Sequence, residues 1–280
     1  MKLRTILFLL FCVLTLVPVV LFWVWPHSKA LEGEFDEVRD RHLLLAQNLG
    51  AALERYHRDV SAAFNLLAAN FDHDHHIRIR RSNEVLFNLG FRHICMAEAA
   101  TGRVVAEFSP AFKKCPEFVP AERFAFFTSI ARADEISFTE VMAGPDGRPI
   151  IYLVRRLSDR IVIGALTTDY FVRLGKAISF GAKGHAAIVD HKGNVLAHPL
   201  DSWIAARKNI AKVSAVKRML KGETGIETFY SPALKGDMVA GFTTVSGPGW
   251  GVMIPQPVEE LIAKAERIKY SVVIVFAAGI

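Results

Sequence analysis

The sequence of 280 residues predicts an α+β protein in which a long helix precedes two tandem modules, each with a five-stranded antiparallel sheet. Three observations lead to this prediction. An N-terminal apolar run continues into a segment with helical periodicity. The same order of strand, turn and helix signals then occurs twice, about 90 residues apart. A second apolar run begins at residue 271.

The first apolar run, residues 6–25, predicts a transmembrane helix. As a helix it reaches about 30 Å, the thickness of the hydrocarbon core of a bilayer. A cleavable signal peptide usually has a shorter apolar region that ends in small residues, whereas this run ends with Trp23 and Trp25. Basic residues precede the run and mostly acidic residues follow it, which places the N-terminus inside. We therefore expect residues 1–27 to form an uncleaved anchor and the middle of the chain to be exported.

Residues 28–70 predict one long helix. Apolar side chains recur at a spacing of three and four residues, which is typical of a helix with one buried face. About 40 helical residues extend about 60 Å, so the helix is long enough to lie along both modules. The periodic positions are Leu31, Phe35, Val38, Leu45, Leu49, Ala52, Tyr56, Val60, Ala63 and Leu67.

The two modules have the same order of signals: two strands around a turn that contains glycine, a helix, two more strands and a closing strand. In the first module these signals fall at 93–109, 121–133, 136–157 and 160–168. In the second module they fall at 185–199, 210–220, 225–245 and 249–256. A last helix is expected at 258–270.

Several stretches of the second module resemble a known family. They are GAKGHAAIVDHKGNVLAHP at 181–199, LKGETG at 220–225 and GPGWGVMIPQP at 247–257. Together with the anchor, the long helix and the paired modules, they resemble the double Cache sensor domains of bacterial chemoreceptors, sensor histidine kinases and cyclic-di-nucleotide enzymes. The resemblance implies two PAS-like modules, a membrane-distal one at 71–176 and a membrane-proximal one at 177–268.

A double Cache domain implies a receptor that binds a small molecule, such as an organic acid or an amine, in its distal module. It also implies an extracytoplasmic sensor region on the cell membrane, and we expect a homodimer. Residues 269–280 start a second transmembrane helix but are too short to cross a bilayer, which takes about 20 residues. We therefore expect either that the output domain is missing from this sequence or that the protein ends at the membrane surface.

Two charged residues are candidates for the ligand contacts that the resemblance implies. Arg123, on the predicted helix of the distal module, has a planar guanidinium that can clamp a carboxylate. Asp169, after the closing strand, lies where amino-acid sensors of this family keep a carboxylate for the amine of the ligand. The helix differs from those sensors because Phe126 and Phe127 stand where Trp and Tyr are expected.

Each of these residues also has a structural alternative. Arg123 suits a surface ion pair, Asp169 suits the N-cap of a helix that starts at Tyr170, and the two phenylalanines suit the core. Tyr152 is the remaining candidate for the site. Residues an odd number apart on a strand point to opposite faces, so we expect Tyr152 to face the pocket and Arg155 to point away from it.

Two of the three cysteines lie in the exported part of the chain. Cys95 and Cys115 are candidates for a structural disulfide, since that compartment is oxidising, whereas Cys12 lies in the apolar run. The alternative is a pair of buried thiols, because sequence does not show whether the two side chains meet.

His73, His75 and His76, with aspartates between them, form the densest candidate metal cluster. Imidazole and carboxylate groups suit zinc or nickel, but a solvated turn between two helices explains the segment equally well. In the second module, His198 precedes Pro199, and we expect its ring to fix a turn by a hydrogen bond.

The sequence argues against several classes of function. The net charge of +6 comes from scattered basic residues without a nucleic-acid-binding motif, so we expect no nucleic-acid partner. We find no phosphate-binding glycine loop, nucleophile elbow, zinc-protease helix, or kinase or cyclase signature, so we expect neither catalytic residues nor a cofactor. Two alternatives to a receptor stay open: a module that docks a periplasmic protein or cell-wall polymer, and a metal-dependent periplasmic hydrolase that uses the histidine cluster.

Overall fold

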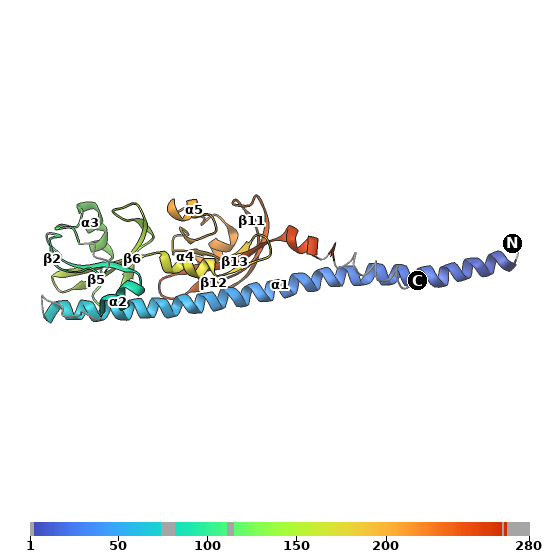
Figure 1. Ribbon diagram of the computed structural model, residues 1–280, viewed down its shortest axis with the longest axis horizontal. Coiled ribbons are helices and arrows are strands. Elements are labelled where there is room, and N and C mark those ends of the chain that lie inside the picture. The colour runs from blue at the N-terminus through green and yellow to red at the C-terminus, as the bar shows by residue number, and fades with distance from the viewer. Residues whose placement is uncertain (1–2, 74–81, 111–114, 265, 268–280) are drawn as a thin grey trace.

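The computed structural model describes residues 3–73, 82–110, 115–264 and 266–267. Its two large β-sheets lie one after the other on the same side of one long helix, α1, which spans Leu3–His73 (Figure 1). Within this described part of the chain, no helix has both the length and the hydropathy that a membrane span requires.

The helix α1 packs against both sheets. One continuous hydrophobic core contains side chains of α1, of the distal sheet and of the proximal sheet. The buried side chains of α1 recur every three or four residues, as the sequence predicts for 28–70. They include Val38, Ala46, Leu49, Leu53, Tyr56, Val60, Phe64 and Leu67. A single helix therefore connects the two sheets mechanically.

The distal sheet has six strands rather than the five that the sequence predicts. The strands are β1 (Phe91–Glu98), β2 (Val104–Phe108), β3 (Ser137–Phe138), β4 (Met142–Ala143), β5 (Pro149–Leu157) and β6 (Arg160–Thr167). Their order is β2-β1-β6-β5-β3, and β4 also pairs with β5. The predicted third strand is split into β3 and β4 because Val141 between them donates its N–H to Asp190 of the proximal module.

The proximal sheet has the five strands that the sequence predicts. They are β9 (Ala187–Val189), β10 (Val195–Ala197), β11 (Gly225–Ser231), β12 (Gly236–Val245) and β13 (Trp250–Pro257), and the short pair β7 (Ser179–Phe180) and β8 (Gly184–His185) precedes them. The order β10-β9-β13-β12-β11 repeats that of the distal sheet when β3 and β4 are taken as one strand. The predicted internal repeat is therefore confirmed in the strand topology.

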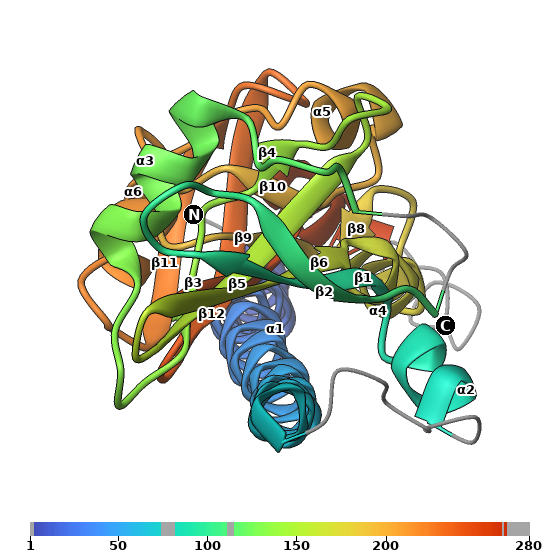
Figure 2. The ribbon, with the colours of Figure 1, turned by 90° about the vertical axis from the view of Figure 1, so that its left-hand side faces the viewer.

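Helices on the other face of the sheets complete each module. α3 (Ala121–Ile130) covers the distal sheet, and α5 (Asp201–Ala205) and α6 (Ser214–Met219) cover the proximal sheet, all opposite α1 (Figure 2). α4 (Asp169–Lys176) leads from the closing strand of the distal sheet into the proximal module, and α2 (Ser82–Asn88) precedes β1. Each sheet is thus enclosed between α1 and a layer of short helices.

Several helix boundaries differ from the prediction. α3 ends at Ile130 rather than at residue 133, because the next residue is already extended. The helix predicted at 210–220 is only α6, since Ile210 donates its N–H to Gly193 instead of starting a helical turn. α5 has no counterpart in the prediction. Residues 258–264 and 266–267 are helical, in agreement with the predicted last helix.

Candidate functional site

Arg123 on α3 reaches over the distal sheet to Tyr152 on β5. Its Nη1 donates to the Tyr152 hydroxyl at 3.1 Å, and its Nη2 donates to the carbonyl oxygen of Ala143 at 2.7 Å. Both acceptors are uncharged. Among the residues that the structure describes, Arg123 contacts no carboxylate, so it does not form the surface ion pair that was the alternative. The half-buried guanidinium of Arg123 is instead held by neutral oxygens.

Strand alternation places Tyr152 on the face that α3 covers. Ile150 and Val154, two residues away on either side, belong to the same buried cluster as Tyr152. Arg155 points to the opposite face, where its Nη1 donates to Oδ1 of Asn65 on α1 at 2.7 Å. The structure therefore agrees with the predicted orientation of both residues.

The Tyr152 hydroxyl is a neutral group of the site. Burial raises its pKa, and the nearby guanidinium groups of Arg123 and Arg92 offset only part of this effect. The hydroxyl therefore keeps its proton at neutral pH. It accepts a hydrogen bond from Arg123 and can donate its own proton to a ligand oxygen.

Arg92 and Asp146 form a second polar pair that the sequence does not reveal. Arg92 donates from Nη1 and Nη2 to the two carboxylate oxygens of Asp146 at 3.0 and 2.8 Å. Regular alternation on β1 puts Arg92 on the same face as Ile94, towards α1. A bulge between Phe91 and His93 breaks the register and lets Arg92 reach the turn that carries Asp146. The contact depends on the bulge, and no feature of the sequence predicts that bulge.

The two candidate phenylalanines lie in different environments. Phe127 is buried, and its ring centre is 5.0 Å from that of Tyr152, so it is part of the wall beside Arg123. Phe126 is partly buried and lines a separate cavity between the two modules. The structure thus brings Phe127 to the Arg123 site, whereas Phe126 packs against the edge of the same buried cluster and also faces the cavity.

Asp169 is exposed in the first turn of α4. The helix starts at Asp169 itself with Thr168 as its N-cap residue, so the predicted capping role of Asp169 is wrong by one position. No hydrogen bond joins it to Arg123 within the described residues. The charge of Asp169 makes a small contribution to the raised pKa of Arg92. Asp169 therefore lies at the edge of the polar site rather than within it.

A chain of hydrogen bonds leads from this site to the proximal module. Thr139 and Tyr152 are joined twice, since the backbone of Thr139 donates to the carbonyl of Tyr152 at 2.9 Å and the N–H of Tyr152 donates to the hydroxyl of Thr139 at 2.9 Å. Two residues further along, Val141 donates its N–H to Oδ2 of Asp190 at 2.8 Å. These hydrogen bonds can therefore transmit a movement of Tyr152 to the β9–β10 turn.

Asp190 is a buried carboxylate that holds this junction together. Its Oδ1 accepts from the backbone of Lys192 and Asn194, and its Oδ2 accepts from the side chain of Asn194 and from Val141. These bonds explain how a charged group with no exposed surface is tolerated. Three bonds form the turn of the proximal module, and the fourth crosses to the distal module.

Replacing Asp190 by asparagine is expected to break the crossing bond from Val141 together with the bond from the Asn194 side chain, because both donate to Oδ2. The amide oxygen can keep the two backbone bonds of the turn, whereas the amide nitrogen then faces the Val141 N–H, another donor. Leaving such buried donors unpaired costs about 1 to 3 kcal/mol. Amide hydrogen exchange at Val141 measures the effect, and Asp201→Asn on exposed α5 is the control. Unchanged exchange at Val141 in Asp190→Asn contradicts the prediction.

The described part of the structure contains two cavities of contrasting size that bear on ligand binding. The cavity between the modules has a volume of about 850 Å³ and is lined by α1, the β3 segment and the turns of the proximal module. The interior cavity of the proximal module is only about 20 Å³, close to the space that one water molecule needs. The proximal interior is therefore closed to a metabolite.

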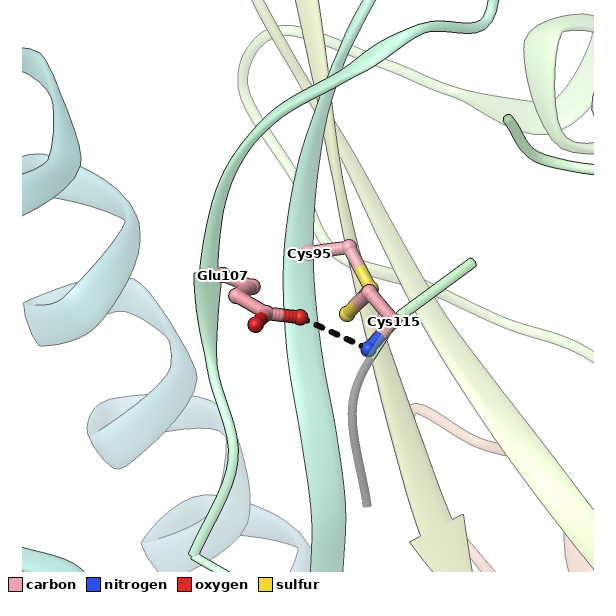
Figure 3. Close-up of a disulfide and its surroundings, with 3 residues drawn as sticks. All are labelled: Cys95, Glu107 and Cys115. Carbon is pink, nitrogen blue, oxygen red and sulfur yellow. Dashed lines mark hydrogen bonds between the residues drawn. A yellow bond between two sulfur atoms is a disulfide. The ribbon is translucent and has the colours of Figure 1, made fainter. Parts of the chain in front are cut away.

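The structure joins Cys95 and Cys115 in a disulfide with a Cα–Cα distance of 6.3 Å (Figure 3). This bridge ties the segment before α3 to β1. The predicted ring bond of His198 is also confirmed, since its Nδ1 accepts from the N–H of Leu200 at 3.1 Å. The histidine cluster cannot be placed: His75 and His76, and the side chain of His73, lie outside the described residues.

The two sheets have the same strand order and pack on one shared helix, and the distal module contains a charged site. Together these features define a tandem sensor architecture. The Cache domain model of the dCache_1 type matches residues 28–265, so the chain belongs to the Cache domain family. The predicted double Cache domain is therefore confirmed. No curated protein sequence matches the chain.

Solved structures show the same fold at low sequence identity. The extracellular domain of a protein described as a histidine kinase, rpHK1S-Z16, has a TM-score of 0.67 and 14% identity, with 80% of this chain and 95% of that domain covered. The ligand-binding domain of the Pseudomonas aeruginosa amino acid chemoreceptor PctB in complex with L-Gln has a TM-score of 0.57 and 16% identity, with 84% of this chain and 98% of that domain covered. The sensory domain of the Campylobacter jejuni chemoreceptor Tlp3 with isoleucine bound has a TM-score of 0.59 and 8% identity, with 83% of this chain and 97% of that domain covered.

Proposed function

We propose that this chain is the extracytoplasmic sensor region of a membrane-bound signalling receptor and that its distal module, residues 71–176, binds a small carboxylate metabolite. Residues 177–268 form the proximal module, which relays the signal. The family and the folds of the structural neighbours support a sensory role. The neighbours bound to amino acids support a small ligand with a carboxylate group.

The different partners of Arg123 and Arg92 are the reason for proposing a carboxylate ligand. Arg123 has only the neutral oxygens of Tyr152 and Ala143 as partners within the described residues, whereas Arg92 is paired with the carboxylate of Asp146. Within the described residues, the site therefore has one guanidinium that is not paired with a carboxylate. A guanidinium and a protonated hydroxyl side by side suit the two oxygens of a carboxylate.

Thermal unfolding of the full chain tests this proposal. Carboxylate metabolites are added one at a time, each beside its neutral amide. A ligand at one hundred times its dissociation constant adds about 2.7 kcal/mol to the free energy of unfolding. We expect stabilisation by at least one carboxylate and by none of the amides. A panel of amino, hydroxy and dicarboxylic acids without any stabilising member contradicts the proposal.

Replacing Arg123 by glutamine is expected to weaken binding of that carboxylate about 10- to 100-fold. A hydrogen bond to a charged group contributes about 1.5 to 3 kcal/mol, which corresponds to this range. Arg156→Gln is the matched control, because Arg156 lies on β5 like Tyr152 but is exposed, and its side chain donates to the carbonyl of Ser158. Isothermal titration of both variants measures the affinities. Equal losses in the two variants would show that Arg123 does not contact the ligand.

The output of the receptor is proposed to run through two helices. Val38 of α1, Val239 of β12 and Leu261 of the C-terminal helical segment form a small buried cluster at the end of the proximal module. A ligand that favours one arrangement of the modules shifts these helices relative to each other by as much as its affinity differs between the arrangements. Such a shift is the signal that a kinase, a chemotaxis domain or a cyclic-di-nucleotide enzyme can read.

Membrane attachment and a homodimer complete the proposal. The apolar run at residues 6–25 and the charges on either side of it support an anchor with the sensor outside. Leu44 and Leu66 are exposed on α1, 22 residues or about six helical turns apart, and thus lie on one side of the helix. Exposed leucines at these two positions suit contact with the α1 helix of a second copy.

A further inference from the structure

The disulfide lies beside a buried histidine that the carboxylate site does not use. Cys95 and His93 are two residues apart on β1 and share one face of the strand. Cys115 comes from the segment after β2, and its N–H donates to Oε2 of Glu107 at 2.7 Å (Figure 3). Glu107 is the direct partner of Cys95 across the β1–β2 pair. Four groups that can ligate a metal therefore lie on neighbouring segments.

His93 has an unused ring nitrogen. The residue is only 9% exposed, and its Nδ1 is buried without a hydrogen-bond partner among the described residues. A ligating nitrogen of His93 and the two sulfur atoms all lie within 4.8 Å of one another. A buried imidazole nitrogen this close to two sulfur atoms is well placed to ligate a metal.

We propose that, once the disulfide is reduced, His93, Cys95 and Cys115 bind one thiophilic cation with a filled d shell, Zn²⁺ or Cu⁺. Thiolate and imidazole are the ligands that these ions prefer. In a tetrahedral zinc site the two sulfur atoms lie about 3.8 Å apart, so they have to separate from their bonded distance but stay within the present cluster. Glu107 or a water molecule supplies the fourth position.

The two states of this site are mutually exclusive. A dithiol, such as that of a thiol–disulfide exchange protein, passes two electrons to the Cys95–Cys115 bond and is itself oxidised to a disulfide. The S–S bond breaks, and the two sulfurs take up two protons from the reductant thiols. Metal binding then releases these two protons, since thiolates rather than thiols ligate the ion. The same sulfur atoms thus hold either each other or the metal.

Zinc binding to the full chain under oxidising and reducing conditions tests the proposal. Cys12 is replaced by serine in every sample, so that Cys95 and Cys115 are the only thiols. The reductant is a phosphine that does not bind zinc, and a chromophoric zinc chelator reports the competition. We expect the reduced chain to bind one zinc ion more than the oxidised chain, because any ion held by His73, His75 and His76 is bound in both. Cadmium in place of zinc is expected to give thiolate-to-metal charge-transfer absorption only after reduction.

Variants distinguish zinc binding at His93, Cys95 and Cys115 from adventitious zinc binding elsewhere. Replacing His93 by glutamine keeps both cysteines and is expected to weaken zinc binding at least 10-fold, whereas His191→Gln, outside the cluster, leaves it unchanged. Cys115→Ser is expected to abolish the cadmium absorption. Circular dichroism of the reduced chain shows whether the fold persists. Loss of the fold on reduction, zinc binding equal in the oxidised and reduced chains, or an unchanged affinity in His93→Gln overturns the proposal.

Discussion

Replacing Gly241 by alanine is expected to separate α1 from the proximal sheet and to reduce the free energy of unfolding by about 4 kcal/mol or more. At this point of β12 the helix passes directly over the strand. A Cβ atom on residue 241 would lie far inside 3.0 Å of the backbone of His42 and Leu43. Backbone atoms cannot rotate away as a side chain can, so the helix has to move as a whole.

The contact matters because it sets the distance between the signalling helix and the sheet. With glycine at 241, α1 comes close enough to bury His42 completely and to pack Val38 against Val239. A displaced helix loses these contacts together. We therefore expect Gly241→Ala to uncouple the proximal module from α1 while the Arg123 site, in the distal module, keeps its structure.

Urea unfolding of the full chain measures this effect, and Gly236→Ala provides a matched control. Gly236 is the first residue of the same strand, and a Cβ atom there meets nothing closer than 4.0 Å. We expect the control variant to lie within about 1 kcal/mol of the wild type, as is usual for a substitution without a steric conflict. A Gly241→Ala chain as stable as the control would show that α1 does not rest on β12 in solution.

Much of the fold could be predicted because it depends on periodicity. The spacing of apolar residues predicts α1, and the repeated turns predict two sheets of one topology. The split of the third distal strand could not be predicted, because it depends on a hydrogen bond from Val141 to Asp190, about 50 residues away in the sequence. The short α5 was missed because five residues are too few to show a helical period.

The candidate site was predictable only where side-chain direction follows from regular structure. Tyr152 lies on a regular strand, and alternation places it next to Arg123. Arg92 lies at a bulge, where alternation fails, so its pairing with Asp146 could not be read from the pattern. Asp169 was chosen by resemblance, and it lies exposed at the start of α4 instead of beside Arg123. The assignment of these residues to a ligand stays a prediction.

Lowering the pH from 7 to 5 is expected to reduce the free energy of unfolding by about 6 kcal/mol. Burial lowers the pKa of His42, His93 and His198 to about 4, from the ordinary value of 6.5. In the unfolded chain these residues bind protons as the pH falls below 6.5, whereas in the folded chain they stay neutral until about pH 4. Acid therefore favours the unfolded state, and each histidine contributes about 2 kcal/mol by pH 5.

Urea unfolding at pH 7 and pH 5, at constant ionic strength, measures this dependence. His57 and His185 add to it in the same direction, because burial lowers the pKa of both rings as well. The variant His93→Gln is expected to remove about 2 kcal/mol of the difference between the two pH values, since glutamine does not titrate. A difference below 1 kcal/mol in the wild type would mean that these rings are hydrated in solution. The helix–sheet interface that encloses His42 would then be open, and α1 would not be held rigidly enough to transmit a displacement.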